Sequence, residues 1–194
     1  MKTLLKKDNN IIISEFYENL FTITSSNFNG KFGYKRGFYI KGIENYVKDF
    51  KKLHKEILNK YKIKNYTGFF TLAKIPDHFF YNYENNIEIF TSIGISHVCF
   101  PGEICKKMGT INIIIVLYEE LKVNASIDIL SLASSIKSYY LCKNGLGYST
   151  PSDAIMVSFK KGNSIEYAGP STKIGFKISK MISDIFEDYF NKFH

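Results

Sequence analysis

The sequence has little of what marks secreted, zinc-binding or membrane-spanning proteins. Its three cysteines, Cys99, Cys105 and Cys142, are an odd number and stand in no CxxC or Cys/His spacing, so we expect neither a disulfide framework nor a structural zinc site. No apolar run reaches the roughly 18 residues that a membrane span needs, and the leucines among the lysines at 2–7 are too short a run for a signal peptide. These absences predict a soluble, cytoplasmic protein with no membrane partner.

The common signatures of catalysis are missing as well. The sequence contains no GxSxG elbow, no HExxH zinc helix, no P-loop and no GxGxxG after a predicted strand. The cysteines have no activating neighbour in the sequence, and Cys142 ends a predicted helix among apolar residues, which is typical of packing. No familiar motif therefore identifies a nucleophile.

Positive charge is in excess, with a formal net charge of +8. The densest run of lysines, at 48–64, alternates with apolar residues at helical spacing, a pattern typical of the solvated face of an amphipathic helix. A nucleic-acid-binding module would need its lysines on one face together with exposed aromatic residues. That class stays a third alternative, and we predict no nucleic-acid partner.

Hydrophobic patterning predicts one α+β domain over residues 1–194, with a mixed sheet of six or seven strands covered by about three main helices. The predicted strands lie at 11–16, 20–24, 37–42, 68–73, 87–96, 111–118 and 154–159, with a turn at 17–19 and a loop at 99–109. The predicted helices lie at about 44–61, at 124–142 with Asn124 as its cap and Asn144-Gly145 as its stop, and from about residue 171. The last helix carries an apolar stripe made of Ile174, Ile178, Ile182, Ile185 and Tyr189.

Small polar residues gather in short segments at the ends of these elements, and the order of the segments is more specific than any one of them. They comprise SSNFNG at 25–30, GFFT at 68–71, TSIGIS at 91–96, GTINII at 109–114, a helix carrying Lys137, STPSDA at 149–154 and YAGPSTKIG at 167–175. In this order the sequence resembles the adenosylcobinamide amidohydrolase (CbiZ) family over roughly residues 20–180.

The resemblance implies hydrolysis of one amide in a corrinoid. Members of the family release aminopropanol from adenosylcobinamide and leave adenosylcobyric acid, a step of cobamide salvage and remodelling. The implied partner is a corrinoid small molecule, and no cofactor or metal site is required, because cobalt enters only as part of the substrate. A homo-oligomer is compatible with this activity, and a directly activated water is the simplest nucleophile.

Three residues are candidates for catalysis. Asn112 lies inside an apolar strand, where its amide must be hydrogen-bonded; it can donate to a carbonyl or an oxyanion, or serve as a structural asparagine. Lys137 can stabilise negative charge or act as a base if burial lowers its pKa, and is otherwise a surface lysine. Asp153 can orient a water or Lys137, or simply cap a turn.

The candidate substrate-binding residues are hydroxyl, amide and glycine residues in the same segments: Ser25, Ser26, Asn29, Gly30, Thr110, Thr150, Ser152, Gly169 and Thr172. The last two precede a helix, whose free N-terminal amides can receive a carbonyl or an anion. Ser171 or Thr172 can equally be no more than the N-cap of that helix.

Departures from the family pattern keep a second function open. The family carries a glutamate two residues before the lysine, and here Ser135 stands in its place. Lys31 replaces a glycine after Gly30. His97 stands where the family more commonly carries asparagine, so His97 either reaches the cobalt of the substrate or replaces one hydrogen-bonding side chain with another. The alternative to an active amidohydrolase is therefore a noncatalytic or degenerate corrinoid-binding relative.

Overall fold

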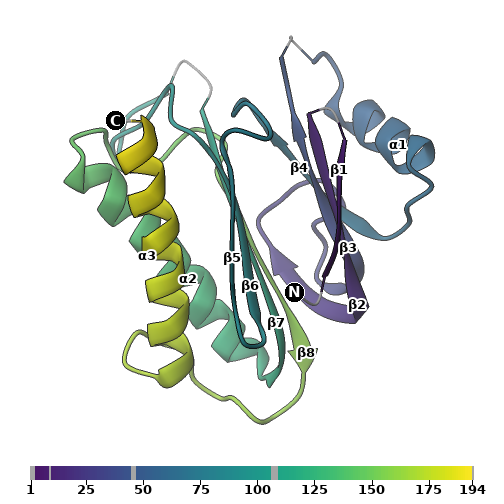
Figure 1. The fold of residues 1–194 in the computed structure, drawn as a ribbon, viewed down its shortest axis with the longest axis vertical. Coiled ribbons are helices and arrows are strands. Elements are labelled where there is room, and N and C mark those ends of the chain that lie inside the picture. The colour runs from purple at the N-terminus through teal and green to yellow at the C-terminus, as the bar shows by residue number, and fades with distance from the viewer. Residues whose placement is uncertain (1–2, 9, 45–46, 106–108, 194) are drawn as a thin grey trace.

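The computed structural model describes residues 3–8, 10–44, 47–105 and 109–193 (Figure 1). In chain order the elements are β1 (Thr3–Asp8), β2 (Ile11–Thr24), β3 (Gly33–Gly42), α1 (Phe50–Lys60), β4 (Tyr66–Thr71), β5 (Phe79–Glu84), β6 (Ile87–Gly94), β7 (Thr110–Leu121), α2 (Val123–Lys143), β8 (Ala154–Lys161) and α3 (Lys173–Phe193). Three helices and a mixed sheet within these residues confirm the predicted α+β class.

The strands form a single eight-stranded sheet whose two halves are joined through β2. The order is β4-β3-β2-β8-β7-β6-β5, and β1 pairs with β2 outside this path. β3 pairs parallel to β4 and β7 parallel to β8, whereas the other pairs are antiparallel. The first part of β2 pairs with β1 and β3, and residues 21–24 pair with β8. A register shift between Glu15 and Leu20 separates these two parts, as expected where a strand bends.

The two halves of the sheet pack face to face around a central apolar core. Along β7, Ile114 and Val116 join a buried cluster with Phe38 of β3, whereas Ile113 belongs to a second cluster that includes α2 and α3. The rings of Phe38 and Phe90 of β6 lie 5.0 Å apart between their centroids. The result is four layers, with α2 and α3 outside β5–β8, and α1 outside the half that contains β1–β4 (Figure 1).

The two long helices, α2 and α3, begin and end close to the predicted residues, with one exception at the start of α2. The predicted stripe of α3 is buried, and α2 ends at Asn144, followed by Gly145 with a φ of 69° that favours glycine. Asn124 is not the N-cap of α2, because the helix starts after Lys122, whose backbone amide bonds to the carbonyl of Ile165 at 2.9 Å. No helix in the described ranges has the length and apolar character to cross a membrane.

Several predicted strand and helix limits were wrong. Residues 11–24 form one bent strand rather than two strands around a turn, and the edge strands β1 and β5 were not predicted, so the sheet has eight strands instead of six or seven. The side chains of β5 are only partly buried or exposed, which weakens any apolar pattern. The first helix starts at Phe50 rather than near 44, because the side chain of Asp49 accepts a hydrogen bond from the amide of Lys52 and caps it.

The cysteines also differ from the expectation. Cys99 and Cys105 are joined as a disulfide within the predicted loop, and their Cα atoms lie 5.8 Å apart. Residues 106–108 of that loop lie outside the described residues. Cys142 is free, and its thiol donates to the carbonyl of Gly147 at 3.0 Å. An odd cysteine count without a recognised spacing did not indicate that this short loop closes on itself.

Candidate active site

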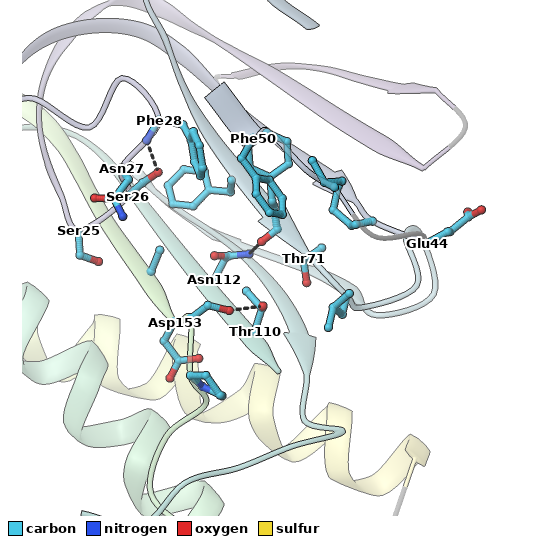
Figure 2. Close-up of a pocket in the computed structure, with 18 residues that line it drawn as sticks. Ser25, Ser26, Asn27, Phe28, Glu44, Phe50, Thr71, Thr110, Asn112 and Asp153 are labelled. Atoms are coloured by element: carbon cyan, nitrogen blue, oxygen red, sulfur yellow. Dashed lines mark hydrogen bonds between the residues drawn. The ribbon is translucent and has the colours of Figure 1, made fainter. Parts of the chain in front are cut away.

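A pocket of about 580 Å³ opens between the two halves of the sheet, where β7 and β8 begin and β4 ends. Its volume lies within the range of about 300–1,000 Å³ that is usual for small-molecule sites. Figure 2 shows the rings of Phe28 and Phe50 in the upper part of the pocket, with Asn112 and Asp153 below them. The polar lining consists of Ser25, Ser26, Asn27, Glu44, Thr71, Thr110, Asn112, Ser152 and Asp153. Six of these were predicted as site residues.

The polar lining arises where the inner face of β7 changes from apolar to polar. Successive side chains of a strand point to opposite faces, so Thr110 and Asn112 share the inner face with Ile114 and Val116. Further along this face the apolar residues close the central core, and at the start of the strand the polar residues line the pocket. The same residue alternation thus builds the core and the site.

Asp153 precedes β8 and is saturated with hydrogen bonds. Its Oδ1 accepts from the amide of Ile111 at 2.9 Å and from the hydroxyl of Thr150. Its Oδ2 accepts from the Lys137 ammonium, from the hydroxyl of Ser149 at 2.7 Å and from the amide of Thr150 at 3.1 Å. A carboxylate offers about four lone-pair sites, so Asp153 would have to give up a bond in order to accept a proton or to orient a water.

Lys137 extends from α2 to the back of Asp153 and does not line the pocket itself. The side chains of this ion pair are 5% and 10% exposed, and the ammonium also donates to Ser149 at 3.0 Å. Ser149 is in turn held by Cys99, whose amide donates to the Ser149 carbonyl at 2.8 Å. Lys137 is therefore a buried lysine rather than a surface one, and it belongs to a paired cluster at the wall of the pocket.

Asn112 uses both of its side-chain N–H groups inside the protein. Its Nδ2 donates to the hydroxyl of Ser92 at 3.0 Å and to the carbonyl of Phe70 in β4 at 3.4 Å. A backbone carbonyl can only accept, so this contact fixes which end of the amide is nitrogen. Oδ1 is then the end that is available, and among the described residues nothing donates to it. Figure 2 shows this oxygen on the side opposite the bonded nitrogen.

Ser25 and Ser26 follow β2 and differ in how their hydroxyls are used. The hydroxyl of Ser26 donates to the carbonyl of Gly68 at 2.6 Å and accepts from the amide of Phe28 at 3.3 Å. The oxygen of Ser25 accepts from the amide of Ile155 at 3.0 Å, and the amide of Ser25 donates to the carbonyl of Ile155 at 3.0 Å. The hydroxyl proton of Ser25 has no acceptor within the described part of the chain, so it can be donated into the pocket.

Thr110 and Ser152 form a short chain of hydroxyls. Ser152 donates its proton to the carbonyl of Gly109 at 2.8 Å, and its oxygen lies 2.7 Å from that of Thr110. Because Ser152 has only one proton to give, Thr110 must be the donor in their contact. The free lone pairs of Thr110 therefore add an acceptor to the pocket.

The opposite side of the pocket is an aromatic wall that the sequence did not indicate. Phe28 packs edge-on against Phe70 with centroids 4.6 Å apart, and Phe50 from α1 packs against Phe70 at 5.1 Å. Behind them, His54 Nδ1 lies 2.6 Å from the hydroxyl of Tyr39, and burial lowers the pKa of the His54 imidazole. The nearest sequence signals were Phe28 inside SSNFNG and Phe70 inside GFFT, neither of which was singled out.

A model of the adenosylcobinamide amidohydrolase family matches residues 2–187 of the 194-residue chain. The chain belongs to this family. The family match confirms the resemblance and extends it beyond the predicted span of 20–180. The sequence matches none of the curated proteins compared with it.

For a member of this family, the position of Ser135 is informative. Ser135 is exposed on α2, and its hydroxyl donates to the carbonyl of Ser131 one turn earlier at 3.0 Å. Lys137 points to the other side of the helix, where Asp153 supplies its carboxylate. The ion pair of this chain is thus complete without a glutamate at position 135.

Three predicted binding residues lie beside the pocket without lining it. Asn29 adopts a φ of 55°, and its amide donates to the carbonyl of Tyr66 at 3.0 Å. Gly30 packs so closely that an added Cβ would lie 1.5 Å from the carbonyl oxygen of Ser26. Thr150 bonds to Asp153 through its hydroxyl and its amide. These residues shape the two segments that carry the lining residues.

Gly169 and Thr172 are not brought to the pocket. They precede α3, and Ile165 bridges to Leu121 at the far end of β7, whereas Asn112 lies near its beginning. The hydroxyl of Thr172 donates to the carbonyl of Gly169 at 2.8 Å and accepts from the amide of Gly175 at 3.0 Å. This pattern is that of an N-cap, which was the alternative for this segment.

Proposed function

We propose that this chain hydrolyses the aminopropanol amide of adenosylcobinamide and releases adenosylcobyric acid. The observation that carries the proposal is the division of the pocket, in a chain that belongs to the amidohydrolase family, into hydrogen-bonding groups, most of them neutral, and an aromatic wall. A corrinoid carries many amides on a large apolar ring, so its recognition needs neutral partners for the amides and apolar surface for the ring. Cobalt enters this reaction as part of the substrate.

In this proposal a water molecule attacks the amide carbonyl while the pocket holds the amide in place. Orientation and donors placed at the developing negative charge supply most of the rate enhancement in such a reaction. Asp153 and Lys137 act by fixing the segment 149–154 and the start of β7, since the oxygens of Asp153 are already occupied. The attacking hydroxyl group ends on the carbonyl carbon, and the proton reaches the departing amine.

The direct test is incubation of the purified protein with adenosylcobinamide. We expect equal amounts of adenosylcobyric acid and free aminopropanol, separated by chromatography, and no change in the adenosyl ligand. Cobyric acid without the aminopropanol arm is the matched control, which should remain unchanged. Binding of adenosylcobinamide without any product would contradict hydrolysis.

That negative result would favour the second candidate, a noncatalytic corrinoid-binding relative. Two points keep it in view: the resemblance leads us to expect a glutamate where Ser135 stands, and the carboxylate of Asp153 is saturated. The two candidates share the pocket and differ only in turnover. Equilibrium binding measured beside product formation separates them in one set of samples.

A further inference from the structure

Among the groups that line the pocket, Ser25 and Asn112 retain hydrogen-bonding capacity of opposite kinds. The hydroxyl proton of Ser25 is available because its oxygen only accepts, from the amide of Ile155. The Oδ1 of Asn112 is available because both N–H groups on its Nδ2 are bonded. By contrast, the hydroxyl proton of Ser26 is already donated to Gly68, and the carboxylate of Asp153 is fully used. Ser25 thus presents a fixed donor and Asn112 a fixed acceptor, beside the hydroxyls of Thr71 and Thr110 elsewhere in the lining.

In the sheet, β8 lies between the donor Ser25 and the acceptor Asn112. Asn112 pairs with Ala154 across β7 and β8, and Ser25 bonds to Ile155 on the other side of β8. Neighbouring strands lie about 4.8 Å apart, so the backbones of Ser25 and Asn112 are separated by roughly 10 Å. Ala154 lies between them and also lines the pocket. Its methyl side chain leaves the space over β8 open.

One amide group with a hydrogen bond at each end is short enough to fit within this backbone separation. The oxygen and nitrogen of an amide lie about 2.2 Å apart, and a hydrogen bond of about 2.9 Å at each end gives a span of about 8 Å. We propose that Ser25 donates to the carbonyl of the substrate amide while Asn112 Oδ1 accepts from its N–H. This inference rests on the proposed function and gives Asn112 the opposite role from the donor that its sequence suggested.

The pair explains selectivity for an amide over related groups. An ester has a carbonyl for Ser25 but no N–H for Asn112, and a carboxylate product places an oxygen against the lone pairs of Oδ1. A buried acceptor that loses its donor costs about 10- to 100-fold in affinity. The site should therefore hold the amide, discriminate against the ester and release the acid.

The test compares adenosylcobinamide with the corresponding ester, in which oxygen replaces the N–H. Asn112→Leu should lower the ratio of kcat/KM for amide over ester by about tenfold or more, because it removes the acceptor that only the amide uses. Ser25→Ala should lower kcat/KM for both substrates by about 10- to 100-fold and leave their ratio unchanged, because both carry the carbonyl. Ser26→Ala is the matched control, and it should leave the ratio unchanged as well.

One more variant and a binding measurement complete the test. Asn112→Asp retains an acceptor but loses the donor to the Phe70 carbonyl; if Asn112→Leu does not fold, the Kd values of the wild-type protein for amide and ester carry the test. A ratio unchanged in Asn112→Leu, or lowered equally in Asn112→Asp, would overturn the pair. If the wild-type protein hydrolyses neither compound, the proposed function fails, and Kd values for the same two corrinoids then replace kcat/KM. Equal Kd values for amide and ester in the wild-type protein would overturn the pair on its own.

Discussion

The cluster around Lys137 and Asp153 and the pair formed by Ser25 and Asn112 are both polar, yet they use their hydrogen-bonding groups differently. In the first, an ammonium, two hydroxyls and two backbone amides all bond to one carboxylate. In the second, each residue is held by the protein on one side and keeps the other side open. The comparison teaches that polarity locates a site, whereas the groups left over after internal bonding indicate what it can bind.

The largest expected effect tests whether the Lys137 cluster is structural. Lys137→Met leaves the carboxylate of Asp153 buried without its cation, which should lower the free energy of unfolding by about 3–5 kcal/mol. The matched control is Lys122→Met, because Lys122 pairs with Glu166 at 2.8 Å with side chains 37% and 54% exposed. That exposed pair should contribute no more than about 1 kcal/mol. Urea denaturation measures both, and equal losses would remove the distinction between the two pairs.

A smaller effect tests how the segment after β2 positions Ser25. Gly30→Ala forces a Cβ against the carbonyl of Ser26, so we expect a loss of about 1–3 kcal/mol in stability together with a lower kcat/KM. Gly169→Ala is the control, since an added Cβ there meets nothing within 4 Å and the residue lies at the far end of the sheet. It should change stability by less than about 0.5 kcal/mol. A fully stable, fully active Gly30→Ala would show that the close contact does not position Ser25.

Much of the fold was predictable because its elements have strong periodic signals. The stripe of α3 is buried against one surface, and the apolar run of β7 is buried on both faces of the sheet, so the sequence carries both directly. The edge strand β5 and the bend in β2 were not predictable, because partial exposure and a register shift both interrupt the alternation of side chains.

The site was predictable in its residues more than in their roles. Ser25, Asn112 and Asp153 were all candidate site residues, and they line one pocket. Whether an amide donates or accepts there depends on partners such as Ser92 and the Phe70 carbonyl, which come from other strands. Gly169 shares the small-residue pattern but lies at the other end of the sheet, since composition does not encode which end of a strand a segment follows.

The smallest expected effect concerns Ser135 and decides between the two candidate functions. Residues two apart on a helix point about 200° away from each other, and Ser135 is exposed while Lys137 is buried against Asp153. A carboxylate at position 135 would therefore meet solvent rather than the lysine. We expect Ser135→Glu to change kcat/KM for adenosylcobinamide by less than about tenfold, equivalent to roughly 1.4 kcal/mol of barrier. Parallel assays of the two proteins measure it, and an inactive wild type rescued by the glutamate would instead make this chain a degenerate binder that has lost a catalytic carboxylate.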